Sequence, residues 1–156
     1  QSVTLISAAQ SYFLQAEATL KGWLPGGDAA AKDLYEAGIT ASFEGFGLDE
    51  DDAFDYYSQN INLVNWDAST DKLEAIITQK WISMTYTNSL EAWTEYRRTG
   101  FPNSTILPST KFPGYDRHMP TIFWYPKSEA DTNGENYKAA GGPNTDPQNQ
   151  KLFWAK

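Results

Sequence analysis

Two glutamates in the stretch SLEAWTEYRRTGFP, Glu91 and Glu95, are the first candidates for chemistry in this sequence. Paired carboxylates catalyse glycoside hydrolysis when they lie about 5–10 Å apart on either side of a bound sugar. Residues four apart on a helix point in the same direction, which leaves no room for a sugar between them. We therefore interpret this pair as structural and predict no catalytic residue.

The remaining residue types argue against most other kinds of reactive site. The chain has no cysteine and one histidine, His118, so thiolate zinc sites and other transition-metal sites are not expected. A set of Ser109, His118 and Asp116 can be written, but no G-x-S-x-G nucleophile elbow accompanies it. A calcium loop that began at the acidic run Asp49–Asp52 would lack its required glycine and glutamate, and we interpret the run as the start of a short helix. We predict neither a metal nor a cofactor.

Charge and aromatic content narrow the possible ligands. The 156 residues carry a formal net charge of -8, and 15% of them are aromatic. Exposed aromatic rings stack on sugars and on nucleic-acid bases, but an acidic protein repels nucleic acid and anionic membrane surfaces. No segment approaches the roughly 20 apolar residues of a membrane-spanning helix. The sequence therefore favours sugars over nucleic acid.

The end of the same stretch reads as a helix terminus stabilised by its neighbours. Spacing predicts an ion pair between Glu95 and Arg98 and a cation–π contact between Trp93 and Arg97. The two arginines stand where a helix dipole favours cations, the glycine suits the left-handed position after a helix, and the proline prevents continuation. The residues of this structural motif are Trp93, Glu95, Arg97, Arg98, Gly100 and Pro102.

Apolar spacing predicts a helical hairpin near the N-terminus, interrupted by LPGGD. Steps of three and four place one set of residues on a single face of each helix. These are Phe13, Ala16, Leu20 and Trp23 in the first helix, and Tyr35, Gly38, Ile39, Ser42 and Phe43 in the second. Asp28 is expected to cap the second helix. Gly38 weakens that helix, so we expect another helix to lie close against it.

Residues 1–100 are predicted to be helical and residues 101–156 mostly irregular, within a single domain over 1–156. Two apolar stripes predict one long central helix that Ser69 or Thr70 caps and that continues to the RRTGFP stop. Seven of the eight prolines follow at or after Pro102, which disfavours regular helix. We expect one short strand, Thr121–Pro126, in a Pro/Gly-rich segment that wraps the helices.

Three stretches in this order resemble a known family. ITQKWISMTYTNSLEAWTEYRRTGFP looks like the signature near the C-terminus of the SusD/RagB family of cell-surface nutrient-binding lipoproteins in Bacteroidetes. YFLQAEATLKGW with YEAGITASFEGFG is similar to that family's late tetratricopeptide-like hairpin. RHMPTIFWYPKSEADTNGENY resembles its closing segment, through Arg117, Pro120, Tyr125, Pro126, Ser128, Glu129 and Asn133.

The resemblance implies a C-terminal portion of a longer, mainly α protein that is not an enzyme. The full-length protein would be lipid-anchored at the extracellular face of the outer membrane. It would bind an oligosaccharide for polysaccharide utilisation and pass it to a SusC-like TonB-dependent transporter. Capture of peptides by a RagB-like member, or a helical protein-interaction scaffold without its own ligand, are the alternatives. The sequence predicts no nucleic-acid partner.

The matching motifs are those of the family's scaffold, so the resemblance transfers no binding residue. If this chain contacts a glycan, an exposed aromatic side chain in a loop is the expected contact. Trp66 and Tyr115 are the candidates that the sequence places best, and packing is the alternative for both.

Overall fold

The computed structural model describes residues 4–85, 87–103, 119–147, 150 and 152–153. Across these residues the protein is mainly helical and contains no strand, which confirms the predicted mainly α fold class. The chain divides into two compact units, residues 1–96 and 97–156. The single domain expected from the sequence stays a prediction.

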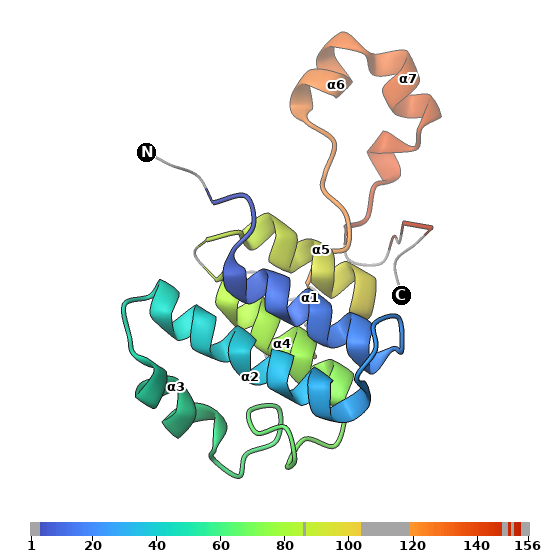
Figure 1. The fold of residues 1–156 in the computed structure, drawn as a ribbon. Helices are drawn as coiled ribbons and strands as arrows, with labels where there is room; N and C mark the ends of the chain where they lie inside the picture. The colour runs from blue at the N-terminus through green and yellow to red at the C-terminus, as the bar shows by residue number, and fades with distance from the viewer. Residues whose placement is uncertain (1–3, 86, 104–118, 148–149, 151, 154–156) are drawn as a thin grey trace. The chain divides into compact units, whose positions relative to one another are not determined.

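The first unit is built on a pair of antiparallel helices, α1 (Ala8–Leu20) and α2 (Gly27–Gly45) (Figure 1). Ser7 caps α1 because its hydroxyl accepts a hydrogen bond from the Gln10 backbone N–H at 3.1 Å. The Gln10 side chain accepts in return from the Ser7 backbone, which completes a capping box. The hairpin packs with α4 (Lys72–Met84), which contacts both helices.

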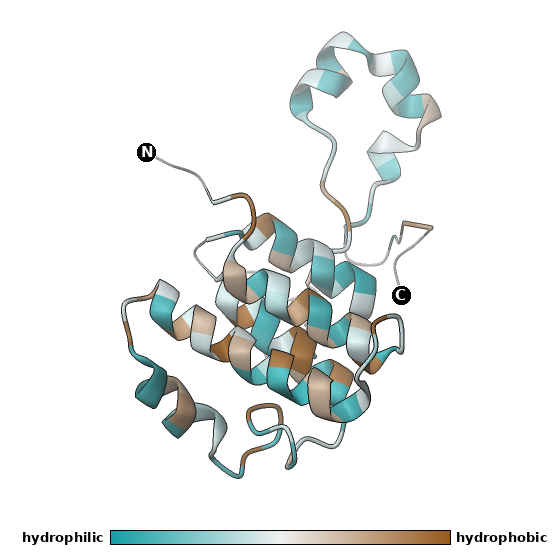
Figure 2. Cartoon of the chain, viewed as in Figure 1, coloured by the Kyte–Doolittle hydropathy of each residue, from teal (hydrophilic) through white to brown (hydrophobic). Residues whose placement is uncertain are grey.

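Three aromatic rings form the centre of this unit's core. The rings of Phe13 on α1 and Tyr35 on α2 meet edge to face, with centroids 6.1 Å apart. The Tyr35 ring lies 5.3 Å from the ring of Trp66, which comes from the loop before α4. All three side chains are fully buried, and Figure 2 shows apolar residues gathered where α1, α2 and α4 face one another. The helical faces predicted from apolar spacing are therefore confirmed around Phe13 and Tyr35. The assignment of Trp23 to the first face was wrong, because α1 ends at Leu20 and Trp23 is exposed in the connection that follows.

Gly38 lies directly against α1, as the sequence predicts. A Cβ atom added at Gly38 would sit 2.7 Å from Cε1 of Phe13 and 2.9 Å from two further atoms of that ring. Contacts of this length do not occur in packed proteins, so the glycine is what allows the Phe13 ring to reach the backbone of α2.

Replacing Gly38 by alanine should lower the free energy of unfolding by about 1–3 kcal/mol, because the overpacking exceeds the gain in helix propensity. Urea denaturation followed by circular dichroism measures the change. Gly45→Ala is the matched control, since Gly45 lies on the same helix and a Cβ there meets nothing within 4 Å. Equal stability of the two variants would contradict the close helix contact.

The helix starts agree with the sequence in one case and differ in another. α3 (Glu50–Tyr57) begins at Asp49, whose carboxylate accepts from the Asp52 backbone N–H at 3.0 Å, so the predicted acidic helix start is confirmed. α2 instead has Gly26 at its cap, and Asp28 lies within its first turn. The prediction that Asp28 is the N-cap was wrong by two residues, because two glycines carry the chain into the helix with positive φ angles.

The predicted long central helix is two helices, α4 and α5 (Ser89–Thr99). Asp71 caps α4, in place of the expected Ser69 or Thr70. Between the helices Thr85 has an extended ψ of 130°. The hydroxyl of Thr87 lies 3.2 Å from the Met84 carbonyl oxygen. Such local side-chain bonds to the backbone compete with the helical ladder, so this polar segment ends α4 despite the continuous apolar pattern.

The second unit contains more helix than the sequence predicts. α6 (Lys127–Thr132) and α7 (Gly134–Ala139) pack on each other, and a 3-10 helix, Gly142–Asn144, follows α7. Pro126 precedes α6 with a φ of -58°, and Lys127 pairs with Asp131 at 2.5 Å along the helix. The proposed strand over Thr121–Pro126 was wrong, because no neighbouring strand pairs with it among the described residues.

Candidate functional site

Trp66 lies in the core of the first unit, where only 1% of its surface is exposed. Its indole N–H donates to the Asp28 carboxylate at 3.2 Å, and Lys72 Nζ lies 5.4 Å from its ring centroid. The indole has no face open to a ligand in this arrangement. Trp66 therefore packs in the core, which was the alternative to a glycan contact. Tyr115, the other candidate, lies outside the described residues.

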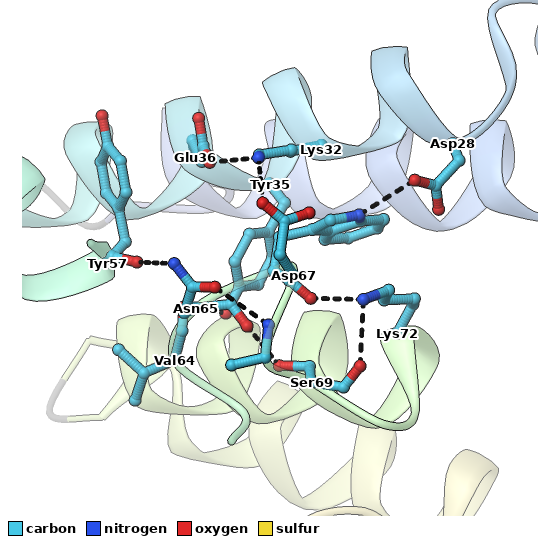
Figure 3. Close-up of polar contacts among 12 residues, drawn as sticks. Asp28, Lys32, Tyr35, Glu36, Tyr57, Val64, Asn65, Asp67, Ser69 and Lys72 are labelled. Atoms are coloured by element: carbon cyan, nitrogen blue, oxygen red, sulfur yellow. Dashed lines mark hydrogen bonds and ion pairs between the residues drawn. The ribbon is translucent and has the colours of Figure 1, made fainter. Parts of the chain in front are cut away.

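Trp66 belongs to a loop of residues 58–71 that buried side chains hold in one conformation (Figure 3). The Tyr35 hydroxyl lies 2.8 Å from the Val64 carbonyl oxygen and 3.2 Å from that of Leu63. Burial raises the pKa of Tyr35 far above its ordinary value, so the hydroxyl remains a donor. Leu63 has a φ of 65°, a backbone conformation that residues other than glycine rarely adopt. Gln79 stabilises it by donating to its carbonyl at 2.8 Å.

Charged and amide side chains fasten the same loop from its outer side. Lys32 Nζ lies 2.6 Å from the Asp67 carboxylate, and this hydrogen bond lowers the pKa of Asp67 and raises that of Lys32. The Asn65 side chain donates to the Tyr57 carbonyl at 2.9 Å and accepts from the Ala68 backbone. Because these side chains bond to one another and to the backbone of the loop, we interpret the network as structural.

Removing the Tyr35 hydroxyl with Tyr35→Phe should lower the free energy of unfolding by about 1–3 kcal/mol, because it leaves the Val64 carbonyl without this buried donor. Thermal denaturation and urea denaturation both report the loss. Tyr12→Phe is the control, because Tyr12 is an exposed tyrosine of α1. Identical melting temperatures for the two variants would contradict a structural role for the Tyr35 hydroxyl.

The helix-stop motif is placed largely as the sequence predicts. Arg97 and Arg98 occupy the last turn of α5, and Gly100 follows with a left-handed φ of 82° before Pro102. The Arg97 guanidinium donates to the Thr121 carbonyl at 3.3 Å, so an arginine of this motif binds a backbone carbonyl of the segment that follows α5.

Glu95 has a partner that sequence spacing did not identify. Its carboxylate forms an ion pair with Lys80 of α4, and both side chains are buried. The predicted pairing of Glu95 with Arg98, and that of Trp93 with Arg97, stay predictions. α4 and α5 approach each other at this pair. To predict it from the sequence, one would have to know how the two helices are aligned with each other in space. The Glu95 carboxylate, which is buried against Lys80, therefore has a structural role.

Three consecutive aromatic rings in the second unit are exposed. The exposed fractions are 70% for Phe123, 61% for Trp124 and 44% for Tyr125. They lie in the segment Thr121–Pro126 that the sequence predicts to be a strand, and they were not among the residues predicted to bind a ligand. The available signal was that a strand alternates its side chains between two faces, so three adjacent rings cannot all enter one core.

Neither a membrane span nor a metal site is found among the described residues. Within the part of the chain that the structure describes, each helix is too short or too polar to cross a membrane. Histidine, aspartate and glutamate side chains there do not come together in groups of three that could hold a metal ion.

Comparison with known proteins identifies relatives of this chain. Residues 1–126 match the SusD-like family described as "Starch-binding associating with outer membrane". No curated protein matches the chain. A crystal structure of a SusD homologue from Bacteroides vulgatus ATCC 8482 is similar over 97% of this chain, with 27% identity and a TM-score of 0.69. One from Bacteroides thetaiotaomicron VPI-5482 covers the same share, with 26% identity and a TM-score of 0.68.

The chain is much shorter than these two relatives. The chain spans 35% of the Bacteroides vulgatus protein and 38% of the Bacteroides thetaiotaomicron protein. The family match alone covers well over half of the 156 residues. It includes the helical hairpin, the α5 motif and the three exposed rings. The chain therefore belongs to the SusD-like family.

Proposed function

We propose that this chain is part of a cell-surface protein that captures a glycan for import. The observation that carries the proposal is the match of residues 1–126 to a family described as starch-binding and associated with the outer membrane. Two features of the chain support it. Exposed aromatic rings are suited to sugars, and the net charge of -8 disfavours nucleic acid.

Isothermal titration calorimetry with maltoheptaose, a starch oligosaccharide, tests glycan binding by the 156-residue chain. We expect saturable binding of the intact oligosaccharide. Chromatography of the incubated sugar should recover maltoheptaose at its original length, because we propose capture without turnover. Binding of oligopeptides but of no neutral oligosaccharide would overturn glycan capture in favour of peptide capture. Release of shorter sugars would overturn the proposed absence of an enzyme activity.

The partner in import is proposed to be a SusC-like TonB-dependent transporter at the outer membrane. The full-length protein would present the glycan to it at the extracellular face, held there by a lipid anchor. Affinity purification of the tagged full-length protein from its native outer membrane should recover the transporter, and its gene should lie beside this one. Recovery without any TonB-dependent transporter would contradict the partnership while leaving glycan binding intact.

A further inference from the structure

We propose that an aromatic platform, made of the exposed residues Phe123, Trp124 and Tyr125, binds a neutral oligosaccharide that stacks on Trp124, its principal ring. This inference rests on the proposed function, and it assigns the ligand to a particular surface. The three rings are consecutive and all are exposed. A large exposed aromatic area marks ligand or partner sites more often than single scattered apolar side chains do.

The platform is fixed at its N-terminal side by Thr121, which is buried. The Thr121 backbone N–H donates to the Pro147 carbonyl at 2.8 Å, and its hydroxyl lies 2.5 Å from the Gln150 carbonyl oxygen. Arg97 binds the Thr121 carbonyl in addition. The backbone N–H and hydroxyl of this residue bind the segment around Pro147 and Gln150, and its carbonyl binds Arg97 of α5. The rings that follow start from a fixed point of the backbone.

The C-terminal side of the platform is held by ring packing. Tyr125 meets Tyr137 of α7 edge to face, with centroids 5.5 Å apart. The Tyr137 ring in turn lies against the backbone of Gly142, where any Cβ atom would clash with it. Pro126 and the start of α6 follow directly. Because the rings are already held at both sides, the protein loses less conformational entropy when it binds a ligand there.

The chemistry around the platform favours a neutral sugar. The C–H face of a pyranose ring packs on an aromatic face, while its hydroxyl groups need hydrogen-bond partners. Exposed amides and a half-buried carboxylate lie on the neighbouring turns: Asn133 bonds to Glu129 at 3.0 Å and to Asn136 at 2.6 Å. Lys127, two residues after Tyr125, is paired with Asp131. With a net charge of -8 on the chain, a nucleic-acid base or an acidic glycan is disfavoured.

The family match supplies the reason to choose a glycan over a protein segment as the occupant. The matched residues, 1–126, end one residue after the three rings, and the family is described as starch-binding. The platform thus lies within the part of the chain that relatives in this family share.

Trp124→Ala tests the platform, with Trp23→Ala as the matched control. Trp23 is also an exposed tryptophan, at 73%, but it stands in the α1–α2 connection beside Lys21. Calorimetric titration with maltoheptaose should show affinity weakened about tenfold or more in Trp124→Ala. Trp23→Ala should keep the affinity within about twofold of the parent. Circular dichroism should show both variants folded, since neither side chain is buried.

Three outcomes would overturn the inference, and they differ in what else they affect. Equal maltoheptaose affinity in Trp124→Ala and the parent would reject the platform and leave glycan capture standing. Tighter binding of a hexagalacturonate than of maltoheptaose would reject the neutral ligand class. Failure of the parent chain to bind any neutral oligosaccharide would reject both the platform and the proposed function.

Discussion

Replacing Glu95 by leucine should lower the free energy of unfolding by about 3–5 kcal/mol. Its carboxylate forms an ion pair with Lys80, and the side chains are only 4% and 2% exposed. Removal of the acid leaves the Lys80 ammonium group buried without its partner carboxylate, where water cannot solvate it. The cost of that uncompensated charge is far larger than the value of an ion pair at the surface. Urea denaturation measures the loss.

Two further variants separate the buried charge from other effects of the substitution. Glu91→Leu is the matched control, because Glu91 lies one turn earlier on α5 and is only half-buried. It should change stability by less than about 1 kcal/mol. The double variant Lys80→Met with Glu95→Leu should recover most of the loss, since both charges are then absent. A double variant no more stable than Glu95→Leu would contradict the proposed cause.

Local patterns in the sequence predicted the parts of the fold that depend on neighbours along the chain. The spacing of Phe13 with Ala16, and of Tyr35 with Ile39, identifies buried helix faces because an α-helix repeats every 3.6 residues. Gly38 indicated a close helix contact because a glycine that weakens a helix needs a packing reason. The start of α3 followed from acidic residues that bind the free N–H groups of a helix terminus.

The features that were missed depend on contacts between distant residues. Lys80 and Glu95 are fifteen positions apart, and they meet only because α4 and α5 are separate helices. The break at Thr85 was hidden because apolar residues recur on both sides of it. The exposure of Trp124 could not be read from its own segment, since a strand assignment required a partner strand that spacing alone cannot supply.

Trp66 was the sequence's candidate for a glycan contact, and its burial leads to the opposite expectation. Trp66→Ala should lower the free energy of unfolding by about 3–5 kcal/mol, because it leaves a large cavity beside Tyr35. It also removes the indole's hydrogen bond to Asp28 and its cation–π contact with Lys72. Thermal and urea denaturation both measure this loss.

Trp66→Phe distinguishes packing from ligand binding, because it retains a ring against Tyr35 while losing the N–H that donates to Asp28. Its stability should fall by less than half as much as that of Trp66→Ala, and maltoheptaose affinity of the folded variant should equal the parent's. Trp124→Ala is expected to behave in the reverse way, with normal stability and weakened affinity. A folded Trp66→Phe variant that loses the sugar would place Trp66 at the ligand and contradict the core assigned here, since a side chain 1% exposed cannot reach a bound sugar.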